Sequence, residues 1–237
     1  MKKLIPLIIC FAFILCTRDI IPTILSADEE YQRAYGYFEK KDYNRSIELF
    51  KYFFNRHPGS EWVDDAQFYY AESFYMMKVY EEALPEFQFL IVNFPNSEYT
   101  EMAYLRKAQC LGNLSPIAQR DQTMTKEALE IYEEFIVRYP YSIYLEEAIE
   151  GRNRMYEKLN QKLLETAKIY IKMGKEESAK IYLNGVIYKS DKWADKAYLL
   201  LGDIFRREGN DSLAYFYYSK VGGEYEDEAK ERLEEIQ

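Results

Sequence analysis

The segment that decides the fold is residues 40–60, which read KKDYNRSIELFKYFFNRHPGS. Three later segments have the same layout: MKVYEEALPEFQFLIVNFPNS at 77–97, TMTKEALEIYEEFIVRYPYS at 123–142 and GKEESAKIYLNGVIYKSD at 174–191. Each has a polar turn, a small residue, an aromatic residue or leucine four positions later, and another apolar residue three positions after that. Apolar residues at this spacing share one face of a helix. The chain is therefore predicted to repeat one helical unit.

A small residue in each unit is matched by a second small residue in the helix before it. The pairs are Ala34 with Ser46, Ala71 with Ala83, Ala108 with Ala128, Ala167 with Ala179, and Gly202 with Ala214. Two helices of a hairpin can approach closely only where both side chains are small. The separation is 12 residues in four pairs and 20 in the third, which predicts eight extra residues in the third turn.

Prolines indicate where the second helices end. Pro58, Pro95 and Pro140 each follow an aromatic residue or histidine, and proline can neither continue a helix nor leave its predecessor in one. Their spacings of 37 and 45 residues differ by the same eight. From Leu145 to Met173 the only breaker is Gly151, so one long helix is predicted to lead into the fourth hairpin.

These signals predict an all-α fold that resembles a tetratricopeptide-repeat solenoid, with five helical hairpins and a C-terminal capping helix. We expect residues 28–237 to form a single repeat domain behind a leader and linker at 1–27. The repeats are placed at about 28–60, 61–97, 98–142, 143–191 and 192–222. The acidic segment 224–237 is the expected cap, since solenoids need a polar terminal element.

The first residues read as an export signal. Lys2 and Lys3 precede LIPLIICFAFIL, an apolar run that has the length of a secretory signal and is short for a membrane span. Cys16 follows the run and precedes polar residues, and we predict that it carries an attached lipid. Two alternatives stay open because Leu15 stands where a small residue is expected. The run could remain as an uncleaved anchor, or cleavage could occur near Ser26-Ala27.

Composition and motifs argue against several classes of function. The net charge of −9 provides no basic stripe for phosphates, so no nucleic-acid partner is predicted. The only histidine, His57, stands in a helix-ending turn, and the chain has no GxGxxG, phosphate-loop, HExxH or paired CxxC motif. We therefore predict no catalytic residue, cofactor or metal site, and interpret Cys110 as a small buried apolar residue. The 24 tyrosines suit half-buried surfaces between repeats or facing a partner.

One local sequence goes beyond a generic repeat. Arg120-Asp121-Gln122 lies in the extended third turn and is followed by KEALEIYEEFIVRYP and by Ser142, Tyr144 and Ala148 before the long helix. On chemistry alone Arg120-Asp121 is a solvated loop pair. With these neighbours, roughly residues 28–220 resemble the BamD family, lipoprotein subunits of the outer-membrane β-barrel assembly machinery.

The resemblance implies an exported, lipid-anchored protein at the periplasmic face of the cell outer membrane. It implies two partners besides the membrane. The C-terminal repeats would bind the periplasmic domains of the barrel-forming subunit, and the N-terminal repeats would receive unfolded outer-membrane proteins. The chain departs from the family pattern at Tyr182, where an arginine is common, at Leu163, where an acidic residue is common, and at Leu15.

The docking surface is predicted in repeats four and five. Asp203, Arg206 and Arg207 follow one another around the helix before Gly209, and Lys180 and Tyr182 could replace the missing arginine. The alternative is that these charges only solvate a helix face.

A receiving groove is predicted on the first helices, which line the concave face of tetratricopeptide arrays. Counting from Ala34 and Ala71, the residues that point into it are Tyr31, Tyr35, Phe38, Phe68, Glu72, Tyr75 and Met76, with Asp65 among them. So many rings aimed at one concavity suggest a site for an extended peptide with bulky apolar residues, such as the terminal strand of an outer-membrane barrel. Alternatively, DIIPTILSA at 19–27 folds over these rings and buries them as core.

Two other functions remain as alternatives. The first is another periplasmic scaffold built from the same repeats, such as a secretion or pilus pilot or a cell-wall coordinator. The extended third turn and the long helix argue against it. The second is an enzyme, which would need a compact cluster of polar groups with shifted titration.

Overall fold

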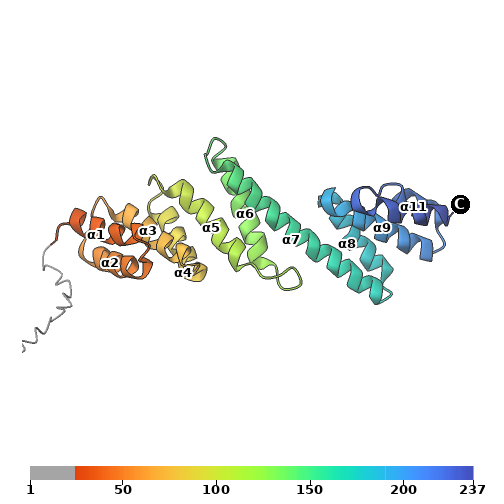
Figure 1. Cartoon of the computed structure of the whole chain (residues 1–237), viewed down its shortest axis with the longest axis horizontal. Helices are drawn as coiled ribbons and strands as arrows, with labels where there is room; N and C mark the ends of the chain where they lie inside the picture. The colour runs from red at the N-terminus through yellow and green to blue at the C-terminus, as the bar shows by residue number, and fades with distance from the viewer. Residues whose placement is uncertain (1–24, 190, 237) are drawn as a thin grey trace, which may run out of the picture.

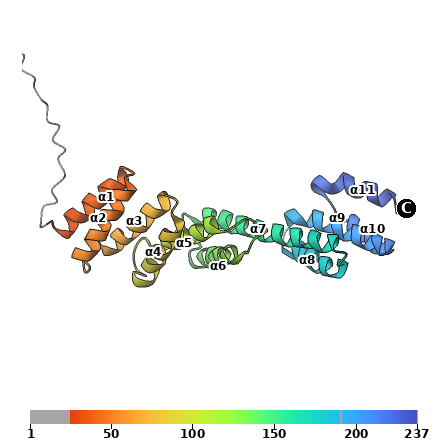
Figure 2. The same ribbon diagram turned by 90° about the horizontal axis from the view of Figure 1, so that it is seen from below.

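The computed structural model describes residues 25–189 and 191–236, and in these ranges the chain is a row of helical hairpins without strands (Figure 1). The predicted all-α array is confirmed. The hairpins are α1 (Ala27–Glu39) with α2 (Tyr43–Arg56), α3 (Val63–Met76) with α4 (Tyr80–Asn93), α5 (Thr100–Leu114) with α6 (Thr123–Arg138), α7 (Leu145–Lys172) with α8 (Glu176–Lys189), and α9 (Asp191–Arg207) with α10 (Asp211–Tyr218). The 3₁₀ turn η1 (Gly223–Tyr225) leads into α11 (Glu226–Glu234), which packs beside α10 at the end of the row (Figure 2).

The repeated apolar positions form the core between the helices of each hairpin. The residues four and seven positions after each small residue are all buried: Phe50, Phe53, Phe87, Leu90, Tyr132, Phe135, Leu183, Val186, Tyr218 and Val221. Burying a side chain of this size contributes roughly 1.5–3 kcal/mol each. Each hairpin therefore buries its own apolar stripe, and the next hairpin covers the remainder.

The predicted small residues lie where the helices of each hairpin meet. All ten are buried, and in the first hairpin the Ser46 hydroxyl donates a hydrogen bond to the Ala34 carbonyl at 3.0 Å. In the fifth hairpin a Cβ on Gly202 would stand 2.4 Å from the Tyr218 ring. Only glycine permits this approach.

Four of the five hairpins turn in the same way. A residue with positive φ follows the first helix: Lys41 (62°), Lys78 (62°), Gly174 (68°) and Gly209 (74°). The amide of the next residue then donates to a carbonyl five positions back, as in Asp42 N to Tyr37 O at 2.9 Å and Asn210 N to Phe205 O at 2.9 Å. This is the Schellman arrangement that closes a helix C-terminus.

The third hairpin has the predicted longer turn, at 115–122. Its backbone is organised by Gln122, whose buried amide donates to the carbonyls of Ile117 (2.9 Å), Arg120 (3.2 Å) and Asp121 (3.3 Å). Lys158 and Lys162 of α7 donate to the Ser115 and Gln119 carbonyls at 3.0 and 2.7 Å. The long turn is thereby held against α7.

Three helix ends and the long helix also lie where the sequence predicts them. His57, Phe94 and Tyr139, the residues before the three prolines, are the C-caps of α2, α4 and α6. The predicted long helix is α7, with Met173 as its C-cap. Gly151 does not interrupt it and is a packing site: a Cβ there would stand 2.3 Å from the ring of Tyr132.

The first helices of consecutive hairpins pack against one another along the array. Helices α1, α3, α5, α7 and α9 each contact the next one in this series. The second helices of consecutive hairpins have no comparable contacts in the part of the chain that the structure describes. The first helices α1, α3, α5, α7 and α9 thus form one continuous side of the array, the side on which the repeat pattern predicts the concave face.

Candidate partner-binding surfaces

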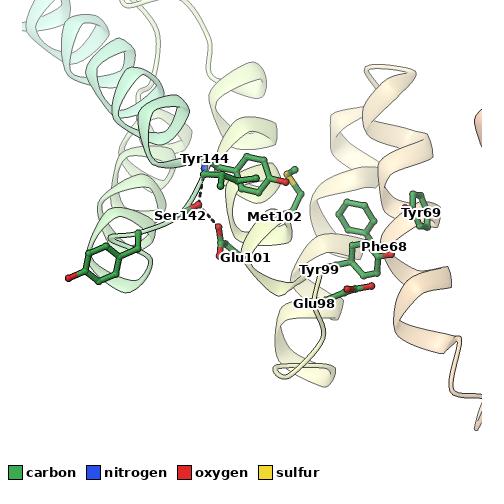
Figure 3. A pocket seen from close by; sticks show the side chains of 10 residues that line it. Phe68, Tyr69, Glu98, Tyr99, Glu101, Met102, Ser142 and Tyr144 are labelled. Atoms are coloured by element: carbon green, nitrogen blue, oxygen red, sulfur yellow. Dashed lines mark hydrogen bonds between the residues drawn. The ribbon is translucent and has the colours of Figure 1, made fainter.

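An aromatic groove lies between α3, the start of α5 and the turn that precedes α7 (Figure 3). Its volume is about 590 Å³. One wall carries Phe68 and Tyr69, the floor carries Tyr99 and Met102, and the other wall is the segment 141–144. Glu98 and Glu101 place two carboxylates at its edge. We call this cavity the aromatic groove.

Ring stacking and hydrogen bonds hold the walls of the aromatic groove. The rings of Phe68 and Tyr99 stack with centroids 4.4 Å apart, and the Tyr99 hydroxyl donates to Asp65 at 3.2 Å. The Ser142 hydroxyl donates to Glu101 and accepts from the Tyr144 amide at 2.9 Å, as the dashed lines in Figure 3 show. Burial raises the pKa of the Asp65 carboxyl and of the Tyr99 hydroxyl.

Two apolar side chains of the aromatic groove face solvent. Tyr141 is 97% exposed and Ile143 is 86% exposed. Both follow Pro140 in the turn between α6 and α7, which lacks the helical face that buries other rings. They are available to a partner without rearrangement of the fold.

A second cavity of about 390 Å³ lies further along the same helices. Its lining is mostly polar: Tyr75 from α3, Gln109, Gly112 and Asn113 from α5, Tyr132 from α6, and Glu147, Arg154, Met155 and Lys158 from α7. Burial raises the pKa of the Tyr132 hydroxyl to about 12, and the charge of Arg154 opposes the rise. We call this cavity the polar groove.

Buried polar contacts join the first helices between the two grooves. Arg106 binds both carboxylate oxygens of Glu72 at 2.8–3.1 Å, with its guanidinium 4.4 Å from the centre of the Tyr75 ring. The Gln109 amide oxygen accepts from Tyr75 (2.9 Å) and Arg106 (2.8 Å), and its nitrogen donates to Glu147 (2.7 Å). Such charge-assisted bonds fix the relative positions of α3, α5 and α7.

The structure does not bring the predicted groove residues together at one site. Phe68 lines the aromatic groove and Tyr75 the polar one. Glu72 is bound by Arg106, and Met76 is 46% exposed. The remaining three form a ring cluster in the first hairpin: Tyr31 is 5% exposed and stacks on Trp62 at 4.9 Å, while Tyr35 and Phe38 are half-buried against Tyr69 at 4.6 and 5.0 Å. Tyr31 is thus core.

Sequence reasoning missed part of the aromatic groove. Tyr99, Tyr141, Ile143 and Tyr144 precede their helices and fall outside the counted repeat positions. The available signal was the run YPYSIY at 139–144, in which apolar residues continue past the helix-ending Pro140.

The predicted docking residues are engaged within the chain. Lys180 binds Glu177 and Glu208 at 2.7 Å each and lies 4.5 Å from the centre of the Phe205 ring, and Tyr182 stacks on Tyr170. Asp203 accepts from Tyr218 and Arg232 at 2.7 Å, Arg206 pairs with Glu235, and Arg207 binds Glu176 at 2.8 Å. These contacts join α9 to α8, α10 and α11. Exposed apolar side chains stand nearby on the second helices: Ile181, Tyr188, Tyr215 and Phe216.

A comparison with known protein families shows which family the chain belongs to. The model of YfiO, described as an outer membrane lipoprotein, matches residues 25–209. The chain belongs to this family. The resemblance to BamD-type outer-membrane lipoproteins is thereby confirmed.

Three solved structures illustrate what this YfiO-family chain is similar to. A TPR repeats protein from Bacteroides fragilis is 15% identical, with a TM-score of 0.43, 90% of this chain covered and 86% of that one. PilW, a type IV pilus biogenesis factor, is 16% identical (TM-score 0.41, covering 82% and 91%). The TPR2AB domain of yeast Sti1 in complex with pHSP90 is 13% identical (TM-score 0.49, covering 82% and 75%). No curated protein matches the chain.

The signature loop of this YfiO-family member has one buried and two exposed residues. Gln122 organises the loop. The Asp121 carboxylate accepts a hydrogen bond from the Thr123 amide at 3.0 Å. The Thr123 side chain, and to a lesser extent this amide, lower the pKa of the Asp121 carboxyl by hydrogen bonding to it. Arg120 is exposed, and within the described residues its side chain has no hydrogen-bond or ion-pair partner. The loop thus presents one cation to solvent beside Ile117.

Two further residues considered in the sequence analysis, Cys110 and His57, lie in the core and at a helix end. Cys110 is buried in the core, as expected, and burial raises the pKa of its thiol to about 12. His57 is partly exposed at the end of α2, 3.5 Å from Glu30. Cys16 lies outside the described residues. Across residues 25–189 and 191–236 we find no helix with the length and apolar character needed to span a bilayer.

Proposed function

We propose that this protein is a scaffold subunit of the machinery that assembles β-barrel proteins in the outer membrane, acting by binding and without a catalytic step. The observation that carries the proposal is the aromatic groove, in a chain of the YfiO family. The exposed side chains of Tyr141 and Ile143 beside a concavity of this size favour an extended segment with bulky apolar side chains. Unfolded outer-membrane proteins supply such segments.

Crosslinking in cells tests this receiving role. A photo-crosslinking amino acid in place of Tyr141 should capture unfolded outer-membrane proteins, because that side chain is almost fully exposed at the groove. The matched control is Val137, which is 81% exposed on α6 and does not line the groove. Equal capture at both positions would refute a specific groove. Capture of secretion or pilus components would support the alternative scaffold function instead.

We also propose that repeats four and five bind the periplasmic domains of the barrel-forming subunit. Because Lys180, Asp203, Arg206 and Arg207 hold the C-terminal hairpins together, direct contact would fall on exposed apolar side chains such as Ile181 and Tyr188 of α8. Ile181→Asp with Tyr188→Asp should reduce copurification of the barrel subunit while leaving the melting temperature unchanged. Full copurification would place the interface elsewhere.

We propose lipid attachment at Cys16 as the route to the membrane. Cys16→Ser should release the protein from the membrane fraction, and the intact mass of the mature protein should include the lipid. A mature N-terminus beyond residue 20 would contradict this proposal.

A further inference from the structure

The first hairpin is the open end of the row (Figure 1). Among the described helices only α3 packs closely against α1 and α2, whereas α11 covers the fifth hairpin at the other end. A solenoid needs a terminal element at each end to cover the side chains that a further repeat would have buried. Within residues 25–189 and 191–236, the structure supplies such an element at the C-terminal end only.

A shallow depression lies on the first hairpin, and no residue of α3 lines it. Leu49 and Tyr52 of α2 form its apolar part, and Tyr52 is 45% exposed. Arg33 and the ion pair between Glu30 and Arg56, at 2.5 Å, form its polar part. Its volume is about 20 Å³, far below the roughly 300 Å³ at which small-molecule sites begin. The depression therefore suits a segment laid across it better than a separate small ligand.

The chain itself enters this depression. Leu25, the first residue that the structure describes, is one of the residues that line it. The next residue, Ser26, is extended, with φ −66° and ψ 163°. A capping box fixes Ser26, because its amide donates to the Glu29 carboxylate at 2.9 Å and its hydroxyl accepts from the Glu29 amide at 3.3 Å. The point at which the preceding residues join α1 is thus held at the depression.

The preceding segment has the composition of a covering element. Residues 20–24 read IIPTI, so four of the five side chains are apolar. Pro22 disfavours a helix in this segment and favours extended chain. An apolar run of this kind is unfavourable in water and gains free energy by covering other apolar surface. The nearest such surface along the chain is the one that Leu25 already lines.

We infer that residues 20–24 lie across the first hairpin, with their apolar side chains against Leu25, Leu49 and Tyr52, and form the N-terminal cap of the array. The rings of Tyr35 and Phe38 offer less room for this segment, because they already pack against Tyr69 of the second hairpin at 4.6 and 5.0 Å. The cap also shortens the connection to Cys16.

The shortened connection has a consequence for the membrane that rests on the proposed lipid attachment. Without the cap, residues 17–24 span roughly 25–30 Å when extended, at about 3.3–3.6 Å per residue. With the cap, only residues 17–19 remain between the anchor and the first hairpin, roughly 10 Å of chain. The first hairpin is then held next to the membrane surface while the rest of the row extends away from Cys16.

Hydrogen–deuterium exchange tests the cap, because it reports the opening of each hairpin separately. The protein is the chain from residue 16 onward with Cys16→Ser, so that the result does not depend on the lipid. Ile20→Ser with Ile21→Ser should speed exchange of the α1 and α2 amides about tenfold and leave α8 and α9 unchanged. The matched control, Ile117→Ser with Ile169→Ser, removes two exposed isoleucines elsewhere and should leave α1 and α2 unchanged.

A double-mutant cycle locates the cap. In a Tyr52→Ala background the two serines should speed exchange by less than about twofold, because the contact surface is already lost. In a Phe38→Ala background they should still speed it about tenfold. The reverse pattern would place the segment on the rings of Tyr35 and Phe38 and overturn the inference. Equal acceleration in both backgrounds, or unchanged exchange with Ile20→Ser and Ile21→Ser alone, would also overturn it.

The cap and the lipid attachment fail in different ways. A mature N-terminus beyond residue 20, read from the intact mass, would overturn both. A mature chain that keeps residues 17–24 without lipid, and still shows the exchange effect, would overturn the attachment and leave the cap standing. Lipid on Cys16 together with unchanged exchange would overturn the cap alone.

Discussion

Gly151→Ala is expected to destabilise the middle of the array, although alanine is the better helix former. In an unconstrained helix the change stabilises by about 1 kcal/mol. Here a Cβ would stand 2.3 and 2.4 Å from two ring carbons of Tyr132 and 2.7 Å from its hydroxyl oxygen. The two carbon distances are more than 1 Å shorter than an ordinary carbon contact of 3.5–4.0 Å. The ring must therefore shift by more than 1 Å or α7 must move away from α6.

Neither movement is easy. Tyr132 is 2% exposed and packs with Leu105, Ala128 and Phe135 in the core of the third hairpin. Overpacking of a filled core costs typically 1–3 kcal/mol, and the overlap here argues for the upper end. Subtracting the gain in helix propensity leaves a net loss of about 2 kcal/mol. For a domain of this size that corresponds to a fall of roughly 4–8 °C in Tm.

The matched control is Gly36→Ala in α1, where a Cβ would meet nothing within 4 Å. It should raise Tm slightly, since only the propensity term remains. Urea and thermal unfolding followed by circular dichroism measure both. A stabilising effect of Gly151→Ala, or equal effects at the two glycines, would refute the argument. In a Tyr132→Ala background the alanine at 151 should become favourable, because the atoms it would collide with are gone.

Three further expectations concern stability. Lys78→Gly should stabilise by roughly 0.5–1 kcal/mol in urea titrations, because its φ of 62° disfavours a side chain; a loss would contradict the turn geometry. Glu72→Gln should lower the free energy of unfolding by roughly 2 kcal/mol, because the partly buried Arg106 guanidinium loses its carboxylate. Glu150→Gln, which removes an exposed ion pair, should lower it by less than about 0.5 kcal/mol. Similar losses in the two variants would contradict this difference. Since burial raises the pKa of the Cys110 thiol from 9.0 to about 12, its contribution to stability is complete below pH 9 and declines as pH rises toward 12. Cys110→Ala should flatten that decline, and rapid alkylation of the folded protein at neutral pH would show that the thiol is not buried.

The hairpins, their helix ends and the longer third turn could all be predicted from the amino-acid sequence. These features depend on interactions within about twenty residues: small residues at 12-residue spacing, prolines after a helix, and apolar residues at positions four and seven. Local sterics and helical periodicity do not change with the tertiary surroundings, so they can be read in advance. Family membership was recognisable for the same reason, because the signature around Arg120 and the long helix is contiguous.

The set of side chains that stay exposed at the candidate surfaces depended on the tertiary structure. Repeat positions identified Phe68 and Tyr75 at the grooves, but they also selected Tyr31, which Trp62 of the next hairpin covers. They omitted Tyr141, which lies in a turn that no repeat position describes. The charges of α9 show the same limit. The sequence predicts that Arg206 is available to a partner, whereas in the structure Glu235, at the end of α11, forms an ion pair with it. Which side chains remain exposed depends on the elements that pack over them, and the superhelical stacking of hairpins sets those contacts.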